Sequence, residues 1–257
     1  MTSDAHDAKA ALKVAVVQLA PGTVLSENLR RADLLITKAA QAGADLIGLP
    51  EVFTVEYRKD LFHSVGEDIA PDAGSSTVPA TGTELLAARA REHKVTVFGG
   101  IVERADGRFY NSVAAYGPTG GLLTVYRKIH LSCVRVGADR TSEADLFTPG
   151  SAGASFAVGG WRVGLGVCFD LRFDLHRAYT RSEAPCDILA YPSAFLESTG
   201  QHHWELLLRA RGLDEQVYVL APNHAKDGAQ VTKMFGHAMV CGPWGQVLCS
   251  TGAREAD

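Results

Sequence analysis

Three side chains that could act together in hydrolysis follow three short apolar runs of this sequence. Glu51 ends the run LIGLPE, Lys128 ends LLTVYRK, and Cys168 ends VGLGVC. In open α/β sheets, ligands collect beyond the carboxyl ends of the strands, so three strand-end residues could meet in one pocket. A thiolate is a strong nucleophile, a shielded carboxylate can shuttle protons, and a lysine can stabilise an oxyanion. Together they predict an acyl-transfer site that needs neither a metal nor a histidine.

Each of these residues also has an ordinary structural interpretation. Free cysteines are among the most buried residue types, so Cys168 could simply belong to the core. Glu51 could be a helix N-cap or a solvated loop carboxylate. Lys128 could be a strand-end lysine whose stem covers apolar surface. Position in the sequence leaves these interpretations open.

The elements that would position these residues alternate between strands and amphipathic helices, which predicts an α/β fold. In the middle third of the chain, several strands follow one another without intervening helices, which predicts a mixed sheet. Residues 132–140 are expected to form a loop. Strands are expected at residues 13–19, 44–51, 95–103, 111–117, 121–128, 162–168, 187–195 and 217–223, with a hairpin around 242–245; helices are expected at 26–43, 85–93 after a capping box at Thr81, 175–182 and 203–216.

Composition is that of an ordinary globular protein, with 46% hydrophobic and 21% charged residues among 257. The sequence has no linker, repeat or second composition, so we expect one domain over residues 1–257, with the first 12 residues flexible. The net charge of −4 and the lack of a dense Lys/Arg run speak against nucleic acid or an anionic membrane as partner.

The five cysteines are odd in number and irregularly spaced, which suits a reducing, cytoplasmic compartment rather than a disulfide framework. Their spacing does not match a zinc site, and the glycine-rich stretches match neither a dinucleotide fingerprint nor a phosphate-binding loop. We therefore expect no metal and no cofactor. No secretory signal and no apolar run long enough to span a bilayer are apparent.

Three sequence motifs, LPEVF, YRKIHL and GVCFDLRF, resemble the three catalytic signatures of the nitrilase or carbon–nitrogen hydrolase superfamily. They occur in the order of that family, and further similar blocks (GGIVE, YNSV, YPSAF, HWELLLRARGLDEQVYV and WGQV) extend the resemblance from residue 13 to 249. The resemblance implies a four-layer α-β-β-α sandwich and a homodimer or higher homo-oligomer. Relatives continue past the position of Asp257, so we expect the C-terminal end to be shortened and the dimer to be weaker.

The same resemblance implies a role for each motif residue. Cys168 is the nucleophile, Glu51 the general base and Lys128 the oxyanion partner, together with the backbone N–H of Phe169. The second glutamate of the family falls on Glu143, which is expected to orient Lys128.

The residues after the nucleophile, Phe-Asp rather than Trp-Glu, make the chain most similar to the Nit-type amidases, which include ω-amidase and deaminated-glutathione amidase. This similarity implies a small amide that carries a carboxylate. A carboxylate needs a cationic anchor, and Arg172 is the candidate, with pairing to Asp170 or Asp174 as the structural alternative. Phe195 and Thr199 are expected on the substrate-facing wall.

Two other function classes are compatible with the same residues. A cysteine–histidine hydrolase would use His130, His176 or His237 as its base. A catalytically silent scaffold would bind partners through a sheet or a dimer face. Within the superfamily, a nitrile or carbamoyl substrate is the alternative to an amide.

Overall fold

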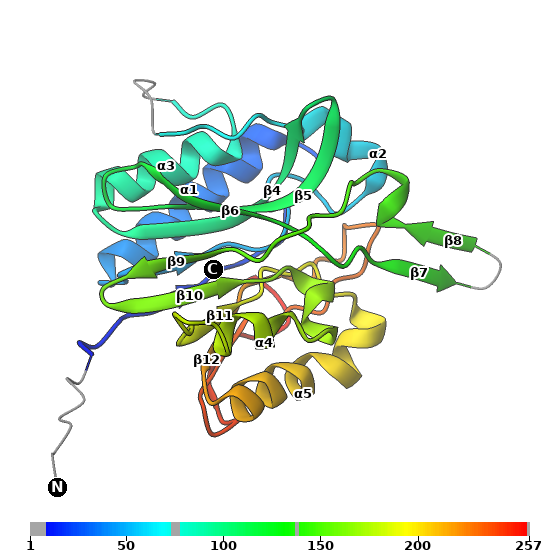
Figure 1. Cartoon of the computed structure of the whole chain (residues 1–257). Helices are drawn as coiled ribbons and strands as arrows, with labels where there is room; N and C mark the ends of the chain where they lie inside the picture. The colour runs from blue at the N-terminus through cyan, green and yellow to red at the C-terminus, as the bar shows by residue number, and fades with distance from the viewer. Residues whose placement is uncertain (1–8, 73–77, 137–138, 256–257) are drawn as a thin grey trace, which may run out of the picture.

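Two β-sheets stack face to face between two pairs of helices (Figure 1). The computed structural model describes residues 9–72, 78–136 and 139–255. Helices α1 (Leu25–Gln41) and α3 (Gly82–His93) cover the outer face of one sheet, and α4 (Leu175–Thr180) and α5 (Glu197–Glu215) cover the outer face of the other. The expected α/β class and the four-layer α-β-β-α sandwich are confirmed.

The first sheet is mixed and has the order β1-β3-β4-β5-β6. Strands β1, β3 and β4 are parallel, and β5 and β6 follow as antiparallel neighbours. As a result β3 and β6 run in the same direction, and their carboxyl ends meet at the same edge of the sheet. The bounds are β1 Val14–Val16, β3 Leu46–Gly48, β4 Thr96–Ala105, β5 Arg108–Tyr116 and β6 Leu122–Arg127.

The second sheet has the order β15-β14-β12-β11-β10-β9, with β10, β11 and β12 parallel at its centre. Its bounds are β9 Ser155–Val158, β10 Trp161–Leu165, β11 Ile188–Ala190, β12 Tyr218–Ala221, β14 Met239–Cys241 and β15 Val247–Ser250. The expected hairpin around residues 242–245 is the β14–β15 connection. A short parallel pair, β2 (Gln18–Leu19) with β13 (Asn223–His224), links the segments that leave the two sheets.

Apolar side chains fill the space between the two sheets. Phe98 of β4 lies against Phe156 of β9, with ring centroids 6.1 Å apart, and both belong to one buried cluster that also takes in Trp204 of α5. A second cluster joins the first sheet to α1 and α3 through residues such as Ile36 and Leu86. Burying these faces drives the layers together and fixes the strand ends relative to one another.

Several elements differ from expectation. The segment expected as a loop at 132–140 contains two paired strands, β7 (Cys133–Val136) and β8 (Asp139–Ser142), with residues 137–138 outside the described part. Helix α5 begins at Glu197 rather than near 203, because its first turns carry polar residues with no apolar period to mark them. The short helices α2 (Lys59–Phe62), η1 (His63–Val65) and η2 (Glu143–Asp145) were also not expected.

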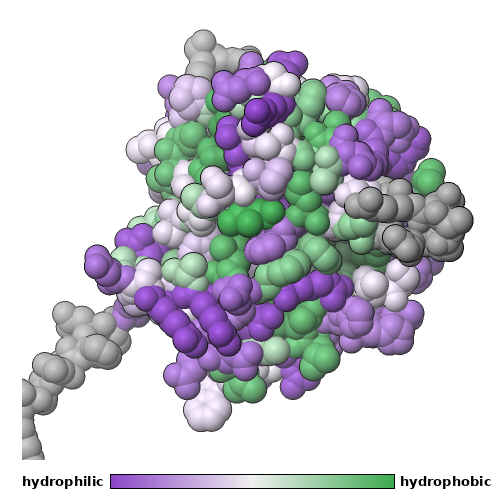
Figure 2. Space-filling view, turned by 45° about the vertical axis from the view of Figure 1, so that its right-hand side comes forward, coloured by the Kyte–Doolittle hydropathy of each residue, from purple (hydrophilic) through white to green (hydrophobic). Residues whose placement is uncertain are grey.

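The surface is a patchwork of hydrophilic and hydrophobic residues over the face seen in Figure 2. Within the described residues, none of the helices is both long and apolar enough to cross a bilayer. Part of the segment expected to be flexible packs on the second sheet: Lys9 pairs with Asp187, and the Ala10 carbonyl accepts from Trp161 Nε1 at 2.8 Å. Residues 1–8 lie outside the described residues.

Candidate active site

The strand-end residues lie where the sheet directions bring them together. Glu51 lies three residues beyond β3, and Lys128 directly follows β6, at the same edge of the first sheet. Cys168 lies three residues beyond β10 of the second sheet, where it starts the short helix η3 (Cys168–Arg172). Glu143, at the start of η2, reaches the same place. Both sheets therefore contribute to one site.

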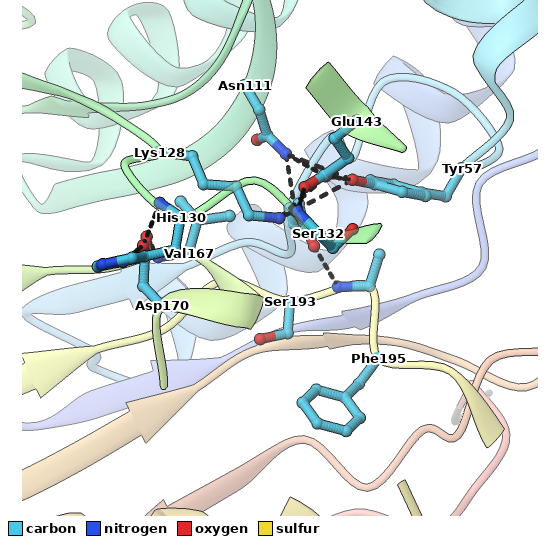
Figure 3. A network of polar contacts seen from close by, with 12 residues as sticks. Tyr57, Asn111, Lys128, His130, Ser132, Glu143, Val167, Asp170, Ser193 and Phe195 are labelled. Carbon is cyan, nitrogen blue, oxygen red and sulfur yellow. Dashed lines mark hydrogen bonds and ion pairs between the residues drawn. The ribbon is translucent and has the colours of Figure 1, made fainter. Parts of the chain in front are cut away.

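A buried lysine sits between two buried carboxylates at the centre of the site. Lys128 Nζ lies 2.8 Å from Glu51 Oε1 and 2.9 Å from Glu143 Oε1, and each of the three side chains is at most 7% exposed. Figure 3 shows Lys128 pointing toward Glu143 from across the cluster. Charges this well shielded interact strongly, because little water is present to screen them. This arrangement excludes the solvent-exposed interpretations of Glu51 and Lys128.

Two neutral side chains hold the carboxylates in place. Asn111 of β5 donates to Glu51 Oε1 at 2.7 Å and to Glu143 Oε1 at 3.3 Å. The Tyr57 hydroxyl donates to Glu143 and lies 3.3 Å from Glu51 Oε1 (Figure 3). Burial and the two nearby carboxylates raise the pKa of Tyr57, so its hydroxyl stays a donor. Both glutamates are thereby oriented without a further charge.

The backbone and second carboxylate oxygen of Glu51 are also fixed. The backbone N–H of Ala194, which follows β11, donates to Glu51 Oε2 at 2.8 Å. His224 of β13 contacts the Glu51 carbonyl oxygen through Nε2 at 2.6 Å, so this nitrogen is the donor. Burial lowers the pKa of His224 to about 4, so the ring is neutral at ordinary pH. Glu51 therefore receives hydrogen bonds from the first sheet, the second sheet and the short β2–β13 pair.

Cys168 occupies a strained turn. Its φ is +43°, a left-handed conformation that non-glycine residues rarely adopt and that is enriched at functional sites. Its backbone N–H donates to Pro192 O at 3.0 Å. Fully buried Asp170 accepts from the Val167 N–H and the Tyr126 hydroxyl at 2.9 and 2.7 Å, so it ties the turn to the first sheet. These contacts fix the backbone of the turn that carries the thiol.

The surroundings of Cys168 favour the protonated thiol. Burial raises its pKa well above the usual value, the negative charge of Glu51 raises it further, and Lys128 offsets part of this effect. A thiol in this state needs a base in order to attack. Among the nearby charges, that of Glu51 has the largest effect on the pKa of Cys168.

Lys128 remains charged despite its burial. Desolvation alone would lower the pKa of its ammonium group, but Glu143 and Glu51 outweigh that cost and raise it. Burial likewise opposes ionisation of Glu143, but Lys128 and the hydrogen bonds from Tyr57 and Ser132 lower the pKa of Glu143 overall. The site thus keeps a fixed positive charge beside the sulfur.

A cavity of about 750 Å³ opens above this cluster. Its lining includes the residues assigned to the amidase site from the family resemblance: Glu51, Lys128, Glu143, Cys168, Phe169, Arg172, Phe195 and Thr199. Phe195 is buried and packs on Trp204, with ring centroids 4.9 Å apart. Phe62 of α2 and Leu146, which follows η2, are among the apolar residues that complete the wall, so a small molecule with both apolar and charged parts fits the cavity.

Arg172 does not take the structural alternative considered for it. It makes no ion pair with Asp170 or Asp174, although all three residues are described. Its Nη2 instead lies 3.2 Å from His203 Nδ1, on α5. Arg172 lines the cavity, and its Cζ lies 5.8 Å from the ring centroid of Phe169 and 5.4 Å from that of Phe195.

The histidines considered as an alternative base lie elsewhere. His130 contacts Asp170 through Nδ1 at 2.7 Å and stacks on Phe173, to one side of the cluster in Figure 3. His176 lies 3.3 Å from Glu215, and His237 packs on Phe235. All three are described, and the cavity lining contains none of them. The site geometry gives no support to a cysteine–histidine pair.

Several residues of the site were not assigned a role from the sequence, among them Asn111, His203, Tyr57 and His224. Asn111 and His203 lie inside similar blocks, YNSV and HWELLLRARGLDEQVYV, and those blocks were the signal that could have identified them. Tyr57 and His224 lie outside any recognisable motif, and their place follows only from the fold.

Residues 13–257 match the carbon–nitrogen hydrolase family. The omega-amidase NIT2 of Xenopus tropicalis is 39% identical over 249 residues, which cover 96% of this chain and 86% of the relative. The human omega-amidase NIT2 is 38% identical over 247 residues, with 95% and 86% covered.

Solved structures are similar across nearly the whole chain. Nit3 of Saccharomyces cerevisiae, a member of branch 10 of the nitrilase superfamily, has a TM-score of 0.83 and 29% identity, with 95% of this chain and 87% of that chain covered. The NitFhit protein of C. elegans has a TM-score of 0.82 and 24% identity, over 96% of this chain and 60% of that one.

Proposed function

This chain belongs to the carbon–nitrogen hydrolase family, and we propose that within it the protein is an amidase for small amides that carry a carboxylate. The products are the free acid and ammonia, formed through a thioester on Cys168. The observation that carries this proposal is the site itself: a buried glutamate and a buried lysine beside a half-buried cysteine at the floor of one cavity, with an arginine in its lining. The relatives named omega-amidase support an amide as substrate.

Acylation begins with the Cys168 thiol. Glu51 takes the thiol proton while the sulfur attacks the amide carbonyl carbon, and the carbonyl oxygen becomes an oxyanion. Lys128 and the backbone N–H of Phe169 stabilise that oxyanion, because their positive charge and dipole are in place before the charge develops. Glu143 orients Lys128 through their 2.9 Å contact.

Release of ammonia and hydrolysis use the same carboxyl group. Protonated Glu51 gives its proton to the leaving nitrogen, the C–N bond breaks, and ammonia departs from the thioester. A water molecule then attacks the thioester while Glu51 takes its proton. The tetrahedral intermediate collapses to the acid, the C–S bond breaks, and the proton returns to the sulfur of Cys168.

The preference for a carboxylate is based on the partners of the cavity cations. Arg172 is paired with a histidine, whereas each of the other described cations in the lining has a carboxylate partner: Arg58 with Asp60, Lys59 with Asp145, and Lys128 with Glu51 and Glu143. Arg172 therefore has its charge available for a ligand, and a guanidinium binds a carboxylate through two parallel hydrogen bonds. Phe195 and Thr199 are proposed to contact the rest of the substrate.

A substrate panel tests this proposal. Ammonia release is measured for 2-oxoglutaramate, deaminated glutathione, a plain aliphatic amide and a nitrile, with the wild type and with Arg172→Lys. Because lysine cannot reproduce bidentate pairing, the preference for 2-oxoglutaramate over the aliphatic amide, expressed as a ratio of their kcat/KM values, should fall about tenfold in Arg172→Lys. A wild-type preference for the nitrile or the neutral amide would overturn the substrate assignment.

We further propose that the protein works as one domain, in the cytoplasm and as a homodimer. Cys168, Cys186, Cys241 and Cys249 carry free thiols, as expected in a reducing compartment.

Large apolar side chains are exposed on and next to α5, including Leu206 and Trp244, at 68% and 86% exposure, and such patches often mark interfaces. Light scattering should give twice the mass of the chain, and Leu206→Ser with Trp244→Ser should lower it; a monomeric wild type would contradict the dimer.

A further inference from the structure

Arg172 is held by a neutral side chain. The guanidinium group has only donors, so in the 3.2 Å contact with His203 the Nδ1 atom must be the acceptor. An imidazole that accepts at Nδ1 carries its proton on Nε2 and has no net charge. Both residues line the cavity, Arg172 from the end of η3 and His203 from the second turn of α5.

Two aromatic rings also contact the guanidinium group of Arg172. Its Cζ lies 5.4 Å from the ring centroid of Phe195 and 5.8 Å from that of Phe169, within the range of cation–π attraction. These contacts and the hydrogen bond to His203 restrict the long side chain without neutralising it. A ligand that binds Arg172 then loses less conformational entropy than it would with a freely moving arginine.

Arg58, which also lines the cavity, shows the opposite arrangement. Its Nη2 and Nε bond Asp60 at 2.6 and 3.2 Å, and Glu56 lies within 3.7 Å. A ligand carboxylate would have to compete with those acids for Arg58. The partner of each arginine therefore decides whether its charge is available to a ligand.

We propose that His203 is a specificity-determining positioning residue: it fixes Arg172 as a neutral hydrogen-bond acceptor and so keeps the guanidinium charge available for the carboxylate of the substrate. This inference rests on the proposed function, in which Arg172 binds that carboxylate. It adds that an amide substrate without a carboxylate gains little from His203.

A matched pair of substitutions separates charge from geometry. His203→Asn places an acceptor oxygen near the position of Nδ1 and stays neutral, whereas His203→Asp places the same oxygen there with a negative charge. The readout is the preference for 2-oxoglutaramate over a neutral aliphatic amide, again as the ratio of their kcat/KM values. We expect His203→Asp to lower this ratio about tenfold relative to His203→Asn, mainly because the carboxylate-bearing substrate binds more weakly and its KM rises, since charged groups strengthen and redirect such hydrogen bonds.

Arg172→Met, measured on the same two substrates, tells the possible failures apart. If Arg172→Met leaves the ratio unchanged, the proposed role of Arg172 fails, whatever the His203 variants do. If Arg172→Met lowers the ratio but His203→Asp and His203→Asn give equal ratios, the inference about His203 is wrong. In the Arg172→Met background, His203→Asp should lower the ratio of kcat/KM values less than it does in the wild-type background. An effect of the same size in both backgrounds would mean that His203 acts independently of Arg172. Circular dichroism checks that each variant is folded.

Discussion

Glu51, Lys128 and Glu143 form a charged cluster that the solvent scarcely reaches. Removing one member of such a cluster leaves the others buried and unpaired, which costs several kcal/mol, of the order of 3–5 in similar cases. A fold retains such a cluster more readily when the charges have a function. Here they lie beside a thiol whose pKa is raised, and we propose that the cluster supplies the base and the positive charge that such a thiol needs.

The first residue-scale prediction concerns proton transfer. Glu51→Gln keeps the shape of the side chain but cannot accept the thiol proton, so both acylation and deacylation should slow, with kcat lower by about a hundredfold or more. Rapid-quench kinetics measure the two steps separately. Glu205→Gln, on the exposed side of α5, is the control. A Glu51→Gln enzyme within a few-fold of the wild type would rule out this role.

The second residue-scale prediction concerns the ionisation of the Cys168 thiol. Because burial and Glu51 raise the pKa of Cys168, the thiolate should be absent at neutral pH and should form only above the ordinary thiol value of about 8.5. The difference in ultraviolet thiolate absorbance between the wild type and Cys168→Ala, followed against pH, measures this ionisation. A thiolate already present at pH 7 would show instead a preformed ion pair with Lys128.

At the scale of elements, β4 determines where the loop after β3 can lie. The backbone of that loop passes directly over Gly100, and a Cβ added there would come within 2.5 Å of Glu51 Cα and 2.7 Å of Val52 N. Val52 itself has a φ of +45°, so this turn is strained and held by its surroundings. Gly100 therefore permits the close approach that brings Glu51 to the site.

Gly100→Ala should consequently displace Glu51. We expect a loss of stability of about 1–3 kcal/mol, as for other overpacked sites, together with a fall in kcat of the folded enzyme. Gly121→Ala is the control, because the nearest atom to its added Cβ is Thr119 Oγ1 at 3.5 Å. Urea denaturation and steady-state kinetics measure the two effects. Wild-type activity in Gly100→Ala would show that the loop is not confined by β4.

Some elements of the fold could be predicted from the sequence, and others could not. Apolar runs marked most of the strands, and the polar residue after each run marked the site, because both signals are local. The pair β7–β8 and the start of α5 were missed, since their residues show no clear period. The contacts of Tyr57 and His224 could not be predicted either, because they depend on how distant segments pack.

At the scale of the whole molecule, the site exists only where the two sheets meet. Glu51 and Lys128 follow strands of one sheet and Cys168 follows a strand of the other, and the N–H of Ala194, which follows β11 of the second sheet, donates to Glu51. The sequence could suggest that such residues share a pocket. It could not supply the distance between the sheets, because that depends on the apolar core between them.

Mass spectrometry of a rapidly quenched reaction with 2-oxoglutaramate tests the central claim most directly. Under conditions where acylation outpaces hydrolysis, the peptide that contains Cys168 should gain the mass of the substrate minus ammonia, and no other cysteine peptide should change. Cys168→Ala should be folded, inactive and free of adduct. Turnover by Cys168→Ala, or an acyl group found on another residue, would contradict the account.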